Sequence, residues 1–146
     1  MRDLPRQLSA EQLAELFEGR TRFVELLATV EDPLGRAREL AHELTDAEKK
    51  DVLDAHPPIG GKATSDRAAR EQGTDDDPAV LAELAELNEA YEEKFGFRFV
   101  VFVNGRPRRD IVPVLRDRLE RTRAEELATG VDELVQIAVS RWHTAA

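Results

Sequence analysis

The chain has 146 residues, with 30 acidic against 21 basic side chains and a formal net charge of −9. A chain of this length forms one domain that buries roughly two-thirds of its unfolded surface. The negative charge favours solubility and argues against sequence-independent nucleic-acid binding, which needs lysine and arginine on the phosphates. No cysteine occurs, which excludes disulfides, thiolate zinc sites and cysteine nucleophiles.

Targeting signals are not found in the sequence. Residues 1–10 lack the apolar region of a secretory leader, and no run of apolar residues is long enough to cross a bilayer. The last residues, 142–146, form no peroxisomal or retention signal. We therefore expect a cytoplasmic protein with no membrane segment, organised as a single domain over residues 1–146.

Helix signals dominate the chain. Gly19, Gly73 and Gly96 are expected to end the first, fifth and sixth helices. The fourth helix is expected to end at Ala55 or His56, because proline follows. Capping residues and prolines predict helix starts at or near Ser9, Thr21, Pro33, Thr45, Ser65, Asp77, Asp110 and Thr122.

One segment breaks the helical pattern. Residues 97–103 are rich in aromatic and β-branched side chains, and the turn signal Asn104-Gly105 follows them. The chain has no second run of this kind, and a lone strand forms no stable sheet. We predict an all-α, single-domain helical bundle with one extended, buried, strand-like crossing at residues 97–103. The next helix is expected from Asp110, with Pro113 in its first turn.

His56 has a rigid setting within the stretch "AHPPIGGK". Pro57 disfavours the α region for His56, and Pro57 and Pro58 lack the N–H groups that would continue a helix. Such a break could hold an imidazole over a pocket, or it could simply end a helix, where a cation suits the helix dipole. His42 lies among charged residues and is expected at the surface.

A second polar group, Arg70-Glu71-Gln72, closes the predicted helix that starts at Ser65. Charged residues at a helix end are usually solvated. A carboxylate that returned to His56 would raise the pKa of the imidazole and orient it, giving an acid–base pair near neutral pH. Both interpretations remain open at this point.

Basic residues cluster near the C-terminal third of this acidic chain. They could bind an anion, or form salt bridges with Glu120, Glu125 and Glu126, which is the commoner outcome on helices. One guanidinium turned inward would suit a carboxylate or a urea-like carbonyl. The set comprises Arg106, Arg108, Arg109, Arg116, Arg118 and Arg121.

Motifs for metals and nucleotide cofactors do not occur. The chain has no HExxH pattern, no P-loop and no GxGxxG, and one framed histidine is too few for a metal site. Any chemistry is therefore expected to run without a metal or a cofactor.

Taken in order, several stretches resemble the family of 2-oxo-4-hydroxy-4-carboxy-5-ureidoimidazoline (OHCU) decarboxylases, which complete urate breakdown to (S)-allantoin. The stretches are His56-Pro57 with Ile59-Gly60, Glu71-Gln72, "LNEAYEEKFGFRFVV" at residues 87–101, and Arg118-Leu119 with Glu126-Leu127. The resemblance implies an all-helical, usually homodimeric enzyme that needs no cofactor.

The resemblance also implies roles for single residues. His56 would be the catalytic acid and Glu71 its partner. The extended segment would offer backbone groups to the substrate, which would explain why it can lack a partner strand. Two positions depart from the family: Ala68 stands where a serine is usual, and Arg121 where an asparagine often follows the Arg-Leu pair. The implied substrate contacts are Pro57, Ala68, Gln72, Phe99, Val100, Val101, Phe102, Val103 and Arg118.

A function of another class fits the same sequence. A non-catalytic helical module could bind a small anion or a protein partner through residues 106–109, and it would need no pairing of His56 with Glu71. The net charge makes a nucleic-acid partner the least favoured possibility.

Overall fold

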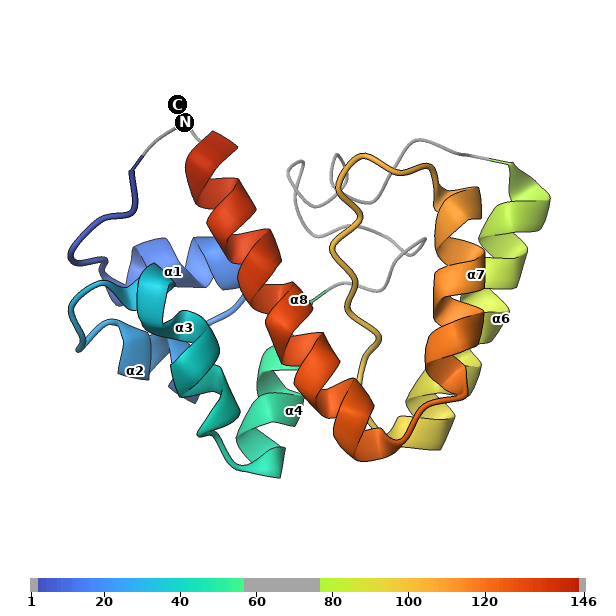
Figure 1. Cartoon of the computed structure of the whole chain (residues 1–146), viewed down its shortest axis with the longest axis horizontal. Coiled ribbons are helices and arrows are strands. Elements are labelled where there is room, and N and C mark those ends of the chain that lie inside the picture. The colour runs from blue at the N-terminus through green and yellow to red at the C-terminus, as the bar shows by residue number, and fades with distance from the viewer. Residues whose placement is uncertain (1–2, 57–76, 145–146) are drawn as a thin grey trace.

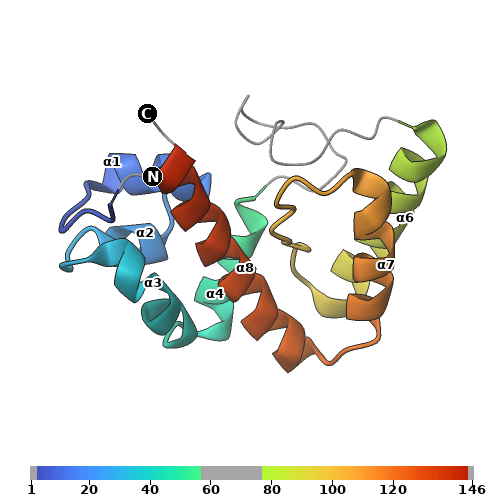
Figure 2. The same cartoon turned by 45° about the horizontal axis from the view of Figure 1, so that its top comes forward.

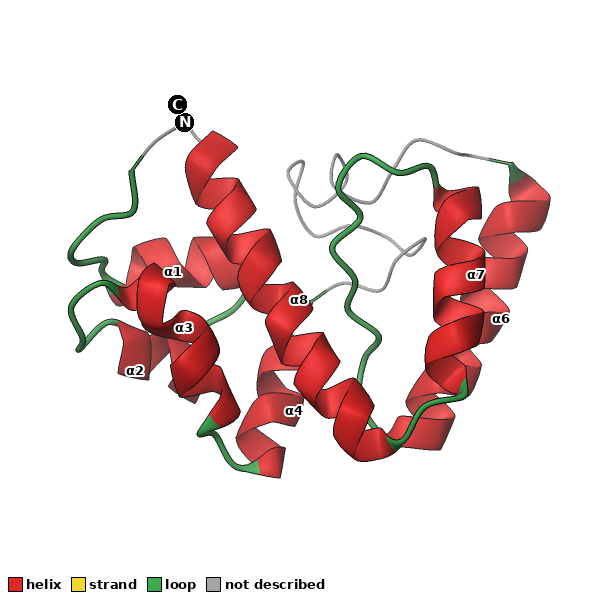
Figure 3. Ribbon diagram, viewed as in Figure 1, coloured by secondary structure: helices red, strands yellow, loops and turns green. Residues whose placement is uncertain are grey.

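The computed structural model describes residues 3–56 and 77–144 (Figure 1). Across these residues the chain forms helices and loops but no strand (Figure 3), which confirms the all-α prediction. The helix expected from Ser65 to Gln72 lies outside the described residues. The helices are α1 (Ala10–Phe17), α2 (Arg22–Leu27), α3 (Pro33–His42), α4 (Asp46–Asp54), α6 (Pro78–Phe95), α7 (Arg108–Leu119) and α8 (Arg123–Thr144).

Local capping chemistry sets most helix starts where the sequence predicts them. Ser9 forms a reciprocal capping box with Gln12, and Thr45 forms one with Glu48. The Asp77 side chain accepts the Ala79 N–H at 2.9 Å, and proline occupies the first position of α6. These caps satisfy backbone donors that would otherwise lack partners at the helix ends.

The end of α1 differs from the prediction. The left-handed residue that ends the helix is Glu18, with a φ of 61°, rather than Gly19. Gly19 has a different role, because a Cβ atom at this position would lie 3.1 Å from the Cβ atom of Ala55. The glycine therefore allows the chain after α1 to pass close to the end of α4.

The start of α7 also differs. The helix begins at Arg108, two residues before the predicted cap Asp110, and Pro107 is its N-cap with a φ of −66°. Proline fixes φ near this value, and with a ψ of 154° the residue has the extended backbone that is typical of an N-cap. As a result Asp110 lies in the first turn and Pro113 lies one turn further in than expected.

Helix α8 runs through the middle of the molecule (Figures 1 and 2). Helices α1, α3 and α4 pack against α8, and α2 packs against α1, α3 and α4. The other side of the molecule is formed by α6 and α7, which pack against each other. None of the described helices has both the length and the hydropathy needed to cross a membrane.

Helices α6 and α7 run in the same direction, so the chain must return from the end of α6 to the start of α7 (Figure 1). The 12 residues of α7 rise about 18 Å. Seven extended residues span about 23 Å, so the crossing at residues 97–103 is long enough for the return. Most of its side chains are buried, which confirms the predicted extended, buried crossing; the buried ones are Phe97, Phe99, Val100, Val101 and Val103.

A buried arginine of α8 joins this helix to the end of α1. Arg141 is 2% exposed, and its guanidinium lies 3.0 Å from a carboxylate oxygen of Glu18. It also donates to the Leu16 carbonyl at 2.8 Å. The arginine thereby satisfies a carbonyl in the last turn of α1, where the helix offers no partner.

Gly130 lies where α8 passes close to Leu53 of α4. A Cβ atom at Gly130 would lie 3.1 and 3.2 Å from two side-chain atoms of Leu53, which is fully buried. We expect Gly130→Val to destabilise the protein by about 1–3 kcal/mol, since overpacking strains a filled core. Urea unfolding measures the loss. Ala124→Val, at an exposed position of the same helix, should cost well under 1 kcal/mol, roughly the difference in helix propensity. Equal losses of stability in the two variants would show that the contact with Leu53 does not limit the size of residue 130.

Candidate active site

His56 lies two residues beyond the end of α4 and is buried, with 7% of its surface exposed. Its backbone N–H donates to the Leu53 carbonyl at 3.1 Å. Both ring nitrogens are buried and have no hydrogen-bond partner among the residues that the structure describes. A buried polar group without a partner is rare and is a mark of a functional site.

Burial also sets the protonation state of His56. Loss of solvent lowers the pKa of the imidazole to about 3, and the positive charges of Arg141 and Arg98 act in the same direction. His56 is therefore neutral near pH 7. The expected effect of a neighbouring carboxylate was the opposite, a raised pKa; Glu71, the proposed carboxylate, lies outside the described residues.

Arg98, which the sequence analysis did not single out, joins the turn of His56 to the crossing segment. Its guanidinium Nη1 donates to the carbonyls of His56 and Asp54 at 2.5 and 3.2 Å. Its backbone N–H donates to the Asp54 carboxylate at 3.0 Å. The signal in the sequence is one charged residue inside an apolar run, since Arg98 interrupts residues 97–103.

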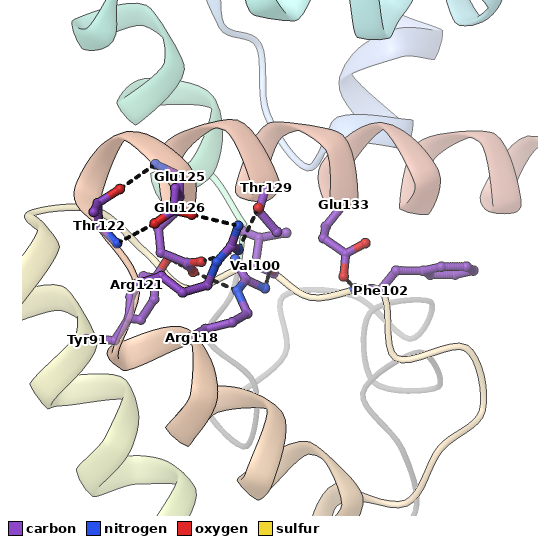
Figure 4. A network of polar contacts seen from close by, with 10 residues as sticks. All are labelled: Tyr91, Val100, Phe102, Arg118, Arg121, Thr122, Glu125, Glu126, Thr129 and Glu133. Carbon is purple, nitrogen blue, oxygen red and sulfur yellow. Dashed lines mark hydrogen bonds and ion pairs between the residues drawn. The ribbon is translucent and has the colours of Figure 1, made fainter.

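A second cluster surrounds the carboxylate of Glu126, in the first turns of α8 (Figure 4). Glu126 is fully buried and binds three side chains: the Tyr91 hydroxyl at 2.7 Å, Arg118 Nε at 2.6 Å and Arg121 Nη1 at 2.7 Å. Burial raises the pKa of the Tyr91 hydroxyl, so the hydroxyl stays protonated and remains a donor. The cluster therefore compensates a carboxylate that has lost all contact with solvent.

This cluster fixes the orientation of Arg118. Nε is held by Glu126, and Nη1 donates to the Val100 carbonyl at 2.8 Å. The guanidinium carbon lies 4.5 Å from the centre of the Phe99 ring. The remaining nitrogen, Nη2, is buried and has no hydrogen-bond partner within the described part of the chain. Arg118 thus has one buried donor that these residues do not satisfy.

The crossing segment links the two sites. Residue 98 holds the His56 carbonyl, and the carbonyl of residue 100 binds Arg118. In an extended chain, the Cα atoms of residues two positions apart are separated by about 7 Å. The segment therefore anchors the backbone of His56 and the guanidinium of Arg118 at neighbouring points.

Arginine side chains also bind other carbonyls of the crossing segment. Arg106 donates to the Phe102 and Val103 carbonyls at 2.7 and 2.9 Å, and the Phe102 N–H donates to Glu133 at 3.4 Å. From the resemblance to the family, a bound substrate was expected to satisfy such groups. For these positions and for Val100 the protein itself supplies the partners.

Several predicted site residues lie outside the described residues: Pro57, Ala68, Glu71 and Gln72. The pairing of His56 with Glu71 therefore stays a prediction. His56 is described and lies just after α4. The remaining predicted substrate contacts gather on one segment and one helix: Phe99, Val100, Val101, Phe102 and Val103 on the crossing, and Arg118 on α7.

The other basic residues of the cluster are engaged within the protein. Arg116 forms an ion pair with Glu83, Arg121 forms one with Glu126, and Arg108 and Arg109 also have interactions of their own. Ion pairs confirm the salt-bridge interpretation for Arg116, Arg118 and Arg121. His42 is at the surface as predicted, 2.7 Å from Asp132. The described residues contain no group of three or more histidine, cysteine or carboxylate side chains that could hold a metal.

An all-helical chain that places a neutral, buried imidazole and one buried guanidinium donor along a single segment has the parts of a small proton-transfer enzyme. The family model described as OHCU decarboxylase matches residues 2–143. The chain therefore belongs to the OHCU decarboxylase family.

Relatives and solved structures agree with this assignment. The chain is 30% identical to the uric acid degradation bifunctional protein PucL of Bacillus subtilis, over 90% of this chain and 29% of that protein. It is also 30% identical to an OHCU decarboxylase of Halalkalicoccus jeotgali, over 73% of this chain and 65% of the relative. The chain thus spans less than two-thirds of the length of both relatives. A crystal structure of OHCU decarboxylase in the presence of (S)-allantoin matches with a TM-score of 0.74 at 25% identity, covering 90% of this chain and 94% of that chain.

The three contacts of Glu126 should differ in their effect on stability. Glu126→Gln leaves the buried Arg118 without its counter-charge, so we expect a loss of about 3 kcal/mol in the free energy of unfolding. Tyr91→Phe removes one neutral donor and leaves both arginines in place, so we expect a loss of about 1 kcal/mol. Urea unfolding of both variants measures these values. If the two variants lost similar free energies of unfolding, the ion pairs with the arginines would not be the main interactions that stabilise Glu126.

The low pKa of His56 predicts a pH dependence of stability. The folded protein takes up no proton at His56 until the pH approaches about 3, whereas the unfolded chain protonates near 6.5. The unfolded state binds more protons below pH 6.5, so this contribution lowers stability as the pH falls. Between pH 6 and pH 5 the wild type should lose about 1 kcal/mol more than His56→Asn. Urea unfolding at both pH values tests this, and parallel losses would contradict a neutral buried imidazole.

Proposed function

We propose that the protein catalyses the decarboxylation of OHCU to (S)-allantoin in urate breakdown, without a cofactor. The observation that carries the proposal is the buried imidazole of His56, whose ring nitrogens have no hydrogen-bond partner among the described residues of a chain in this family. The proposal covers this one reaction and not the further activity of longer relatives such as the bifunctional protein of Bacillus subtilis.

The proposed substrate contains its own electron sink. OHCU carries a hydroxyl and a carboxylate on one ring carbon, beside a ring C=N bond. When the C–C bond to the carboxylate breaks, CO₂ leaves and the electron pair moves toward the ring nitrogen, which takes up a proton. The resulting intermediate has a C=C bond that bears the hydroxyl. Transfer of a proton from the hydroxyl to the neighbouring carbon then gives allantoin.

His56 is proposed to perform this last transfer. A neutral imidazole accepts the hydroxyl proton, and the imidazolium so formed delivers a proton to one face of the neighbouring carbon, which sets the handedness of the product. The rigid setting of His56 supports this role, since its backbone N–H and C=O are both hydrogen-bonded. We propose Glu71 as the residue that orients the imidazole or contacts the hydroxyl.

Arg118 is proposed to bind the ureido and ring oxygens through its free Nη2 donor. It should not bind the departing carboxylate, because a guanidinium that stabilised the carboxylate more than the transition state would slow its loss. We propose Pro57, Gln72 and residues 99–103 as further substrate contacts, with water or Ser65 in place of the hydroxyl that Ala68 lacks.

We also propose that the protein is a cytoplasmic homodimer. The support is the resemblance to the family and the acidic composition, with a formal net charge of −9. The same charge supports the absence of a nucleic-acid partner.

Loss of the imidazole should abolish stereospecific turnover. Fresh OHCU, made in situ by urate oxidase and hydroxyisourate hydrolase, should give the circular-dichroism signal of (S)-allantoin with the wild type. His56→Asn should lower the rate by about 100-fold or more, the usual contribution of a general acid–base group. Racemic allantoin forms without an enzyme, so only catalysis produces handedness.

The matched control is His42→Asn, which removes an exposed imidazole paired with Asp132 and should keep the wild-type rate. An undiminished rate in His56→Asn would remove this histidine from the mechanism. Racemic product with the wild type, together with tight binding of allantoin in isothermal titration, would favour the non-catalytic module instead.

A further inference from the structure

Arg98 binds both ends of the turn that carries His56. The fourth helix ends at Asp54, and its last carbonyls have no partners within the helix. Arg98 supplies donors to the Asp54 carbonyl and to the His56 carbonyl, and its own N–H is held by the Asp54 carboxylate. These contacts join residues that are 42 to 44 positions apart in the sequence.

The His56 backbone is thereby fixed on both sides. Its N–H donates to Leu53 at 3.1 Å, and its carbonyl accepts from Arg98 at 2.5 Å. With both neighbouring peptide groups held and 7% of its surface exposed, the residue can vary little except by rotation of the ring. The position of the His56 imidazole therefore depends on the guanidinium of Arg98.

Glu92 of α6 fixes the guanidinium in turn. Its carboxylate lies 3.1 Å from Arg98 Nε, on the side opposite to the donors that α4 uses. The planar guanidinium can serve both partners at once, which a lysine ammonium cannot do with the same geometry. Arg98 thus connects α4, α6 and the crossing segment through one rigid group.

We propose that Arg98 is a positioning residue, which holds His56 at a fixed distance from the substrate-lining segment on which Arg98 itself lies. The inference rests on the proposed function of His56 in proton transfer. Arg98 acts through the His56 backbone and does not contact the substrate, so it should affect the chemical step rather than substrate binding.

Arg123 provides a matched control. It binds the Phe95 carbonyl at 3.1 Å and lies over the Phe97 ring at 5.4 Å, so it too anchors the start of the crossing segment with a guanidinium. Its contact with α4 is at Asp46, at the start of that helix, far along the helix from His56. Arg98→Met and Arg123→Met therefore both remove an anchoring arginine, but only the first releases the His56 carbonyl.

Steady-state kinetics on OHCU separate the two variants. Arg98→Met should lower kcat by about 100-fold, the effect of a displacement of about 1 Å at a catalytic group, with little change in KM. Arg98→Lys retains a single cationic donor and should recover part of the loss. Arg123→Met should keep kcat close to the wild-type value. The proposal would be overturned if Arg98→Met had the kcat of the wild type, whether or not its KM changed.

A spectroscopic measurement tests the positioning without turnover. The chain has three histidines, so ¹⁵N-histidine labelling resolves each imidazole by NMR. Arg98→Met should shift the ring signals of His56 and leave those of His42 in place, while Arg123→Met should shift neither. If Arg98→Met does not fold, Arg98→Lys gives the same comparison with a smaller shift.

Unchanged His56 signals in a folded Arg98 variant would overturn the positioning role. This readout also distinguishes the two proposals. A wild type that gives no (S)-allantoin, combined with a selective His56 shift, would reject the proposed function and keep the structural role of Arg98.

Discussion

Arginine side chains hold the crossing segment in the way that a neighbouring strand holds a strand in a sheet. Arg118 binds the Val100 carbonyl, and Arg106 binds those of Phe102 and Val103. Just before the segment, Arg123 binds the carbonyl of Phe95, the last residue of α6. An extended backbone in a helical core would otherwise bury polar groups without partners, at a cost of several kcal/mol for each group. The parallel pair of α6 and α7 requires such a segment, so the fold depends on these guanidinium groups.

Other arginines influence the electrostatics around His56. Arg98 and Arg141 place positive charge near His56 and help to keep its imidazole neutral, in a chain whose net charge is −9. Arg118 uses two of its nitrogens to hold the fold, and its third nitrogen is buried without a hydrogen-bond partner among the described residues. The proposed substrate contact of Arg118 would thus use a side chain that also holds the fold, and an exchange for lysine would disturb both.

The sequence predicted the features that depend on neighbours along the chain. The capping boxes of Ser9 and Thr45 lie within four residues, so composition and spacing suffice to place those helix starts. The extended crossing was also predictable, because one β-like run had no second run to pair with. The salt bridges of Arg118 and Arg121 with Glu126 followed from proximity across a short turn.

The features that sequence reasoning missed depend on packing between distant segments. The contact of Arg98 with His56 spans 42 residues, and the burial that lowers the pKa of His56 comes from elements that meet only in the folded chain. The close passage of Gly19 beside Ala55 likewise belongs to tertiary structure. Within the crossing segment, the anchors at residues 98 and 100 lie on a two-residue spacing. One inserted residue would turn every later side chain to the opposite face. Relatives that keep this architecture should therefore differ in the volume of these side chains more readily than in the number of residues between them.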